Sequence, residues 1–93
     1  MLEKQIEQKV CDYARSLGVL ALKFTSPQRA AVPDRLMITP TGKVYFIEFK
    51  REGQKPTPAQ MREHQRLRDN KVDVFVIDNV TDGVALVERM MLC

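Results

Sequence analysis

The pattern of apolar and polar residues divides the chain into helix-like and strand-like segments. Between residues 2 and 17 apolar residues recur at helical spacing, and Gly18 follows as a helix-ending residue. Further along, short runs rich in β-branched and aromatic residues replace the helical spacing. They predict strands at residues 19–25, 35–39, 43–50 and 72–77, the last apolar enough to be buried on both faces.

Proline and glycine mark the connections between these segments. Residues 26–33 lack periodicity and are bracketed by prolines, so they are expected to form a loop. Pro40-Thr41-Gly42 is typical of a tight turn. Because the connection is so short, the strands on either side of it are predicted to pair antiparallel.

Two more helices are predicted in the second half of the chain. Thr57 as N-cap, Pro58 at the first helical position and Gln60 in a capping box indicate a helix that runs to about Asn70. A turn at residues 78–81 then leads into a short helix from Asp82 to Leu92. The order α-β-β-β-α-β, followed by a short C-terminal helix, predicts an α/β fold with a mixed central sheet flanked by helices.

Length and hydropathy add expectations about organisation and location. A chain of 93 residues is expected to form one domain spanning residues 1–93. No stretch approaches the roughly 20 apolar residues of a membrane span. The charged N-terminus lacks the apolar centre of a signal peptide, so a cytoplasmic protein is expected.

Charge is distributed unevenly along the chain. Residues 15–71 contain twelve Lys or Arg and five Asp or Glu, a balance of +7, whereas the rest of the chain carries −4. This excess indicates a polyanionic partner, although a basic surface that only aids solubility explains the charge equally well. With His64 as the sole histidine and two isolated cysteines, a zinc site, a histidine triad and a disulfide framework are not expected.

The most informative polar residues stand at the end of the third predicted strand. Glu48 and Lys50 alternate with Phe49, so they project from one face with their Cα atoms about 6.6 Å apart. Alone, such a pair is more often a solvated ion pair. Two observations favour a site: the flanking residues are apolar on both faces, and the hairpin brings Asp34, which follows Pro33, to the same open end.

Two carboxylates brought this close repel each other, and a bound cation is the usual means of keeping both ionised. Oxygen ligands without thiol or imidazole indicate Mg²⁺, with Mn²⁺ as a substitute. The backbone carbonyl of Phe49 could complete the protein's share of the coordination. A cation and a lysine at this point would suit a phosphodiester substrate.

These residues resemble a known family of nucleases. Pro33-Asp34, thirteen further residues and then Glu48-x-Lys50 resemble the PD-(D/E)xK motif, whose superfamily has a restriction-endonuclease-like core. The closer resemblance is to the virus-type replication-repair nuclease domain, VRR-NUC. Its features span almost the whole chain: Ile6-Glu7 before Gly18, Val32–Leu36, Phe46–Lys50 and Pro56–Gln60. The family often has glycine where this chain has Ala31-Val32.

The resemblance implies a role for each matching residue. Asp34 and Glu48 would bind the metal through their side chains and Phe49 through its carbonyl, while Lys50 would orient or help deprotonate the attacking water. Glu7 would add an acidic group from the first helix, although by itself it reads as a solvated glutamate. Gln60 matches a position near the family's active site, and the capping box explains it equally well.

The resemblance also bears on substrate and assembly. Stand-alone members of the family, typical of phages and bacteria, resemble homodimers that act on four-way (Holliday) junctions during DNA repair. The apolar residues between Val84 and Leu92 could form such an interface or cap their own sheet. Candidate phosphate contacts, each equally readable as a free surface cation, are Lys23, Arg29, Arg35, Arg51 and Lys55.

The sequence thus predicts a Mg²⁺-dependent, structure-selective DNA endonuclease, a metal-dependent phosphodiesterase of the dimeric junction-resolvase type. Recognition should depend on DNA shape, because no segment resembles a base-reading helix. Two alternatives stay open: a non-cleaving DNA-binding module of the same fold, or a nuclease that acts on flaps or RNA.

Overall fold

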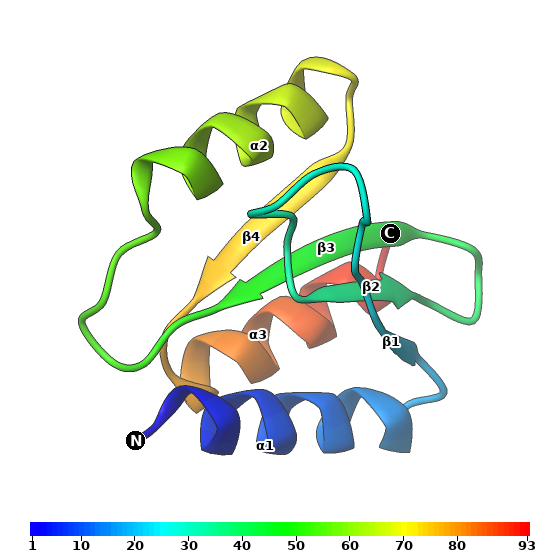
Figure 1. Cartoon of the computed structure of the whole chain (residues 1–93). Helices are drawn as coiled ribbons and strands as arrows, with labels where there is room; N and C mark the ends of the chain where they lie inside the picture. Colours follow the sequence, from blue (N-terminus) through cyan, green and yellow to red (C-terminus); the bar gives the residue numbers. More distant parts are fainter.

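The computed structural model describes residues 1–93, which form a four-stranded sheet with helices on both faces (Figure 1). The elements, in chain order, are α1 (Glu3–Ser16), β1 (Leu20–Lys23), β2 (Arg35–Ile38), β3 (Val44–Phe49), α2 (Pro58–Asp69), β4 (Asp73–Ile77) and α3 (Val80–Met91). The predicted fold class and element order are confirmed. The last helix begins at Val80 rather than Asp82, because Asn79 caps it by accepting a hydrogen bond from the Asp82 amide at 2.8 Å.

The sheet has the strand order β1-β2-β3-β4 and is mixed. β1 pairs antiparallel with β2, and β2 pairs antiparallel with β3 as the tight turn between them predicts; Gly42 takes a positive φ of 90° in that turn. β4 pairs parallel with β3, and α2 makes the crossover between them. β3 is therefore central and is bonded on both sides, which makes it a rigid support for residues at its end.

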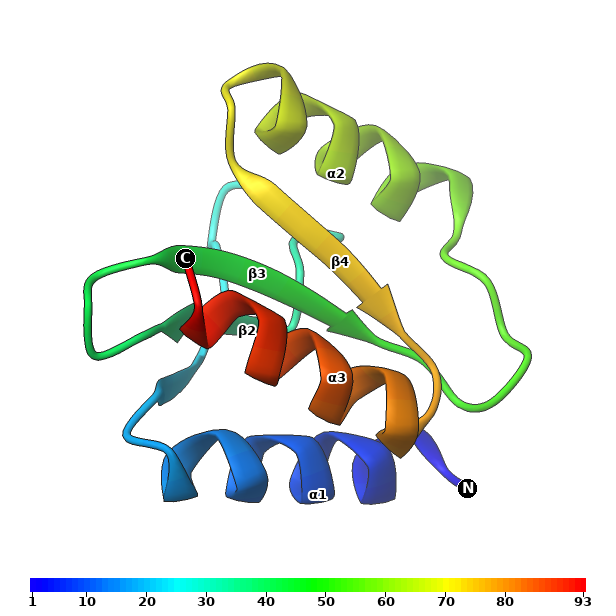
Figure 2. The same ribbon diagram turned by 180° about the vertical axis from the view of Figure 1, so that it is seen from behind.

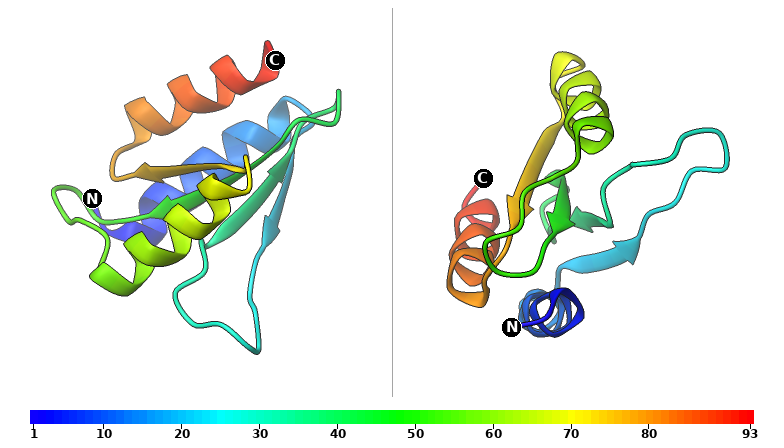
Figure 3. Two further views of the ribbon diagram at one scale, coloured as in Figure 1. Left: turned by 90° about the horizontal axis from the view of Figure 1, so that it is seen from above. Right: turned by 60° about the vertical axis from the view of Figure 1, so that its left-hand side comes forward.

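The core lies between the sheet and the layer formed by α1 and α3 (Figures 2 and 3). Tyr45, Ile47 and Phe49 alternate along β3 and are fully buried on this face. Where α3 crosses α1, a Cβ on Gly83 would lie 2.4 Å from Val10 Cγ2, so the two helices approach too closely for a side chain. None of the helices is both long and apolar enough to cross a membrane.

The opposite face of the sheet is covered unequally. α2 lies over β4 only, and β4 is an edge strand whose Val76 is 36% exposed, so the expectation that β4 is buried on both faces is wrong. The exposed apolar side chains Leu20, Leu22 and Val44 lie on the part of this face that α2 leaves open, here termed the open β1–β3 face.

The apolar residues of the C-terminal helix α3 are buried within the protein's own core. Leu86, Val87 and Met90 are buried in the core against α1 and the sheet. Of the two readings left open by the sequence, α3 thus follows the one in which it caps its own sheet. Three exposed apolar side chains of β1 and β3, Leu20, Leu22 and Val44, lie instead on the open β1–β3 face.

Candidate active site

The hairpin of β2 and β3 places Asp34 beside Glu48. Arg35 pairs with Ile47 across the two strands, and continuing that antiparallel register by one residue sets Asp34 opposite Glu48. Asp34 is fixed there because its Oδ2 accepts a hydrogen bond from the Phe49 amide at 2.8 Å. The predicted convergence of these two carboxylates at one open end is present in the structure.

Glu48 is a buried carboxylate, with only 2% of its surface exposed. Its pKa is raised from 4.5 to about 8, mainly by burial, then by the negative charge of Asp34 and a hydrogen bond with it. Lys50, buried on the same face, acts in the opposite direction, with its Nζ 3.9 Å from Glu48 Oε2. One lysine does not offset burial and a second carboxylate, so the site favours an added positive charge.

Helix α2 reaches the same carboxylate from the other side. Gln60 Nε2 donates to Glu48 Oε2 at 3.4 Å, while its Oε1 accepts from the Thr57 amide in the predicted capping box. His64, one turn further along, places its Nε2 3.4 Å from Glu48 Oε1. Burial, then the charges of Arg68 and Lys50, lower the pKa of His64, which favours the neutral imidazole.

The donors at this site fit a hard divalent cation. No group of three or more His, Cys, Asp or Glu side chains is placed to hold a metal ion by itself. Mg²⁺ commonly binds through one or two carboxylates, with waters and substrate phosphates completing its shell. Asp34 and Glu48, with the carbonyl of Phe49 between Glu48 and Lys50, match that requirement, and a cation there would relieve the conflict between the two carboxylates.

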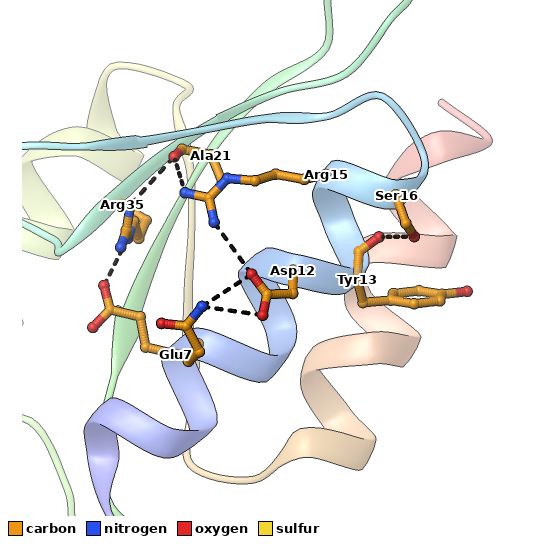
Figure 4. A network of polar contacts seen from close by, with 8 residues as sticks. Glu7, Asp12, Tyr13, Arg15, Ser16, Ala21 and Arg35 are labelled. Carbon is orange, nitrogen blue, oxygen red and sulfur yellow. Dashed lines mark hydrogen bonds and ion pairs between the residues drawn. The ribbon is translucent and has the colours of Figure 1, made fainter.

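Glu7 takes part in a different network, on the face of the sheet that α1 covers (Figure 4). Its Oε2 accepts from Arg35 Nε at 2.6 Å and lies 3.6 Å from Lys23 Nζ. Arg35 also donates to the Ala21 carbonyl at 3.2 Å, and Arg15 donates to the same oxygen. Arg35 lies on the core face, because it pairs with Ile47, whereas Glu48 faces the other way.

The α1 carboxylate that contributes to the raised pKa of Glu48 is Glu3, one turn before Glu7. Glu3 and Glu7 are four residues apart, so helical periodicity alone puts them on one face and cannot choose between them. The solvated alternative for Glu7 is wrong, because Glu7 is 8% exposed and paired. Its role at the active site stays a prediction that its partners do not favour.

The side chains predicted to contact phosphates differ in their exposure and in whether they already form ion pairs. Arg51 and Lys55 are exposed in the loop that follows Lys50. Lys23 and Arg29 are also exposed, but Lys23 pairs with Glu7 and Arg29 with Glu63 of α2 at 2.5 Å. Arg35 has a side chain that is 14% exposed and already bonded, which argues against a contact with DNA.

A mixed sheet with two carboxylates and a lysine at the end of a central hairpin defines the restriction-endonuclease-like class of α/β proteins. Similarity to a solved VRR_NUC domain is close: the TM-score is 0.85 at 34% identity, over 92% of this chain and 94% of that one. A protein named "Putative nuclease p44", from Acyrthosiphon pisum secondary endosymbiont phage 1, is 47% identical over 77 residues, 83% of each chain. No family model matches the chain. The chain belongs to the VRR-NUC family.

Two residues near Glu48 were not singled out from the sequence. A lone histidine among charged residues gives no sign of a partner. Glu3 lies one helical turn from Glu7, and the sequence gives no reason to prefer it. For His64 the usable signal was its spacing of four from Gln60, which puts both residues on one face of α2.

Proposed function

We propose that this protein is a Mg²⁺-dependent endonuclease that hydrolyses phosphodiester bonds in branched DNA. Family membership supports the nuclease activity, and the similarity to a phage protein named as a nuclease agrees with it. The observation that carries the proposal is the buried Glu48 held beside Asp34, with Lys50 on the same face. The same relative supports a cytoplasmic site of action, in a bacterium or a phage-infected host.

The chain's own residues would bind and orient the reactants. A divalent cation held by Asp34, Glu48 and the Phe49 carbonyl would supply Lewis acidity toward the phosphoryl group. Lys50 would orient the attacking water and offset negative charge that develops on the phosphoryl oxygens. Arg51 and Lys55, exposed in the next loop, would hold the neighbouring phosphates without reading sequence.

Branched DNA as the substrate and a homodimer as the active form are further parts of the proposal. Two symmetric sites suit a substrate with two-fold symmetry, such as a four-way junction. The open β1–β3 face is the proposed contact between the two copies. This face lies on the same side of the sheet as Glu48, since Val44, Phe46 and Glu48 alternate along β3. Pairing of two copies through it would therefore bring their two active sites to the same side of the dimer.

Cleavage assays on defined substrates test the proposal. Labelled four-way junction, flap, linear duplex and single-stranded RNA are each incubated with the protein, with Mg²⁺ or with chelator. Glu48→Ala and Lys50→Ala are assayed beside the wild type, and Glu52→Ala, an exposed change in the adjoining loop, serves as the control. We expect chelator-sensitive incision of branched DNA that each site variant reduces at least about 100-fold, while DNA binding survives.

Each alternative has its own signature in this assay. Cleavage that persists in Glu48→Ala contradicts the site. Binding without incision by the wild type supports a non-cleaving module. Preferred cutting of flaps or RNA changes the substrate assignment and leaves the active-site assignment intact.

A further inference from the structure

Two buried polar atoms without hydrogen-bond partners, one on Glu48 and one on His64, face each other. Glu48 Oε1 and His64 Nε2 are both inaccessible to water, neither has a hydrogen-bond partner, and they lie 3.4 Å apart. A buried polar atom without a partner destabilises the fold by roughly 1–3 kcal/mol. A movement of about 0.5 Å would bring this pair to an ordinary N–H···O distance and satisfy both atoms at once.

The burial of His64 is not explained by the hydrophobic core. His64 is 1% exposed and is the sole buried residue of α2. The core cluster lies on the other face of the sheet, between the strands and the layer of α1 and α3. On its own face, therefore, His64 is buried where α2 packs over β4, and its ring reaches Glu48 on the neighbouring strand β3.

Two side chains of α2 lie against the two oxygens of the Glu48 carboxylate. Gln60 donates to Oε2 while His64 faces Oε1, and these two residues stand one helical turn apart. The Gln60 side chain is itself fixed, because its Oε1 accepts from the Thr57 amide at the start of the helix. The helix thus limits rotation of the Glu48 carboxylate about its last bond.

We propose that His64 is a positioning residue that donates a hydrogen bond from Nε2 to Glu48 Oε1 and, with Gln60, orients this carboxylate for cation binding. The inference rests on the proposed function, in which Glu48 binds the cation. Partners that orient a ligand in this way typically contribute 10- to 100-fold in metal affinity. His64 acts through Glu48 and need not touch the substrate.

The first test observes the contact without any metal or cleavage. His64 is the only histidine in the chain, so a ¹⁵N spectrum of the imidazole contains one ring and needs no assignment. We expect a neutral ring protonated at Nε2, with an Nε2–H resonance that shifts in Glu48→Ala. A ring that is unprotonated at Nε2, or a resonance that Glu48→Ala leaves unchanged, overturns the inference.

The second test measures Mn²⁺ binding by calorimetry in the full chain. His64→Leu should weaken binding about 10-fold or more, and His64→Gln, whose amide nitrogen can replace Nε2, should retain most of the affinity. Gln65→Leu, on the exposed side of the same helix, is the matched control and should bind as the wild type does. Equal affinity in a folded His64→Leu variant overturns the inference.

Failure of the proposed function is distinguishable from failure of this inference. If the wild type binds no Mn²⁺, the cation site is wrong, and the spectrum alone then decides whether His64 bonds to Glu48. If His64→Leu does not fold, the spectrum of the wild type and the affinity of His64→Gln still decide it.

Discussion

At the scale of single residues, Glu48 is where burial and charge conflict most strongly. Its carboxylate is almost inaccessible to water, and Asp34 adds a second negative charge beside it. Both effects stabilise the protonated form, and both would be reversed by a cation between the two groups. The stability of the metal-free protein should therefore depend on pH in a direction opposite to that of an ordinary salt-bridged carboxylate.

We expect the free energy of unfolding of the metal-free protein to fall as pH rises from about 5 to about 8. In this window the unfolded chain has released the Glu48 proton, since its pKa there is near 4.5, whereas the folded chain retains it up to about 8. Stability then falls by at most about 1.4 kcal/mol per pH unit. Urea unfolding across this range measures the slope.

Glu48→Gln is the matched variant for that experiment, because it keeps the shape of the side chain and cannot ionise. Its unfolding free energy should vary less with pH than that of the wild type, and Mg²⁺ should stabilise the wild type most at the alkaline end. The same slope in both proteins would contradict a raised pKa at Glu48.

Ala31 is a second residue whose conformation has an energetic consequence. Its φ is +66°, in the left-handed region that costs a residue with a Cβ roughly 1–2 kcal/mol. This is the loop in which the family often has glycine. Ala31→Gly should raise the free energy of unfolding by about 0.5–1 kcal/mol, measured by urea denaturation.

Ala30→Gly is the control for this change, since Ala30 is exposed in the same loop and does not have a positive φ. It should leave stability unchanged or lower it, because glycine only adds freedom to the unfolded chain there. Equal effects of the two substitutions would rule out strain at Ala31.

At the scale of elements, local signals were sufficient where the structure is local. The capping box at Thr57 and Gln60 and the turn at Pro40–Gly42 are formed by residues close in sequence, and both are present. The hairpin then brought Asp34 and Glu48 together through register alone. Asn79 was missed as an N-cap because aspartates and a threonine around it suit a turn equally well.

The sequence could not predict on which face of the sheet a side chain from a distant segment lies. Glu7 and Glu3 share a helix face, and only the packing of α1 on β1 and β3 directs Glu7 to Arg35. His64 became a neighbour of Glu48 through the docking of α2 over β4, a contact between segments with no shared local pattern. Such placements follow from tertiary packing, which periodicity does not encode.

The crossing of α1 and α3 gives a prediction at this scale. Gly83→Ala should destabilise the protein by about 1–3 kcal/mol, because the new Cβ would meet Val10 Cγ2 at 2.4 Å and Ile77 Cγ2 at 3.2 Å. This loss should exceed the roughly 1 kcal/mol by which alanine favours a helix over glycine. Urea unfolding measures the difference.

The same substitution in a Val10→Ala background shows whether the clash is the cause. With the valine methyl groups removed, Gly83→Ala should cost less or become favourable, and the double-mutant cycle should give a coupling energy above about 0.5 kcal/mol. An identical cost in both backgrounds would mean that Gly83 matters for some other reason.

At the scale of the whole molecule, the covered and uncovered faces of the sheet have different roles. One face is closed by α1 and α3, whereas the other carries Glu48 and Lys50 at one end and exposed apolar side chains at the other. Apolar surface gathered on one face of a small protein commonly marks a contact with another chain. In the proposed homodimer, this contact would leave the catalytic end accessible to DNA.

Leu22→Glu tests this arrangement, because Leu22 is 45% exposed on the open β1–β3 face. We expect sedimentation to show a shift from dimer to monomer, since a charge would be buried at the contact. Leu92→Glu, at a side chain that is 89% exposed beyond α3, should leave the dimer intact. A wild type that sediments as a monomer at micromolar concentration contradicts the proposal.

The way in which α2 is attached affects the lifetime of the site. α2 contributes one buried side chain, packs against β4, and is tied to the loop before β2 by the ion pair of Arg29 and Glu63. A helix held so sparingly should open at a lower free energy than the core, with early amide exchange along its length. Glu48 would then lose its two α2 neighbours while the rest of the fold persists. Salt, which weakens an ion pair that is partly exposed, should increase the fraction of time that the site spends disassembled.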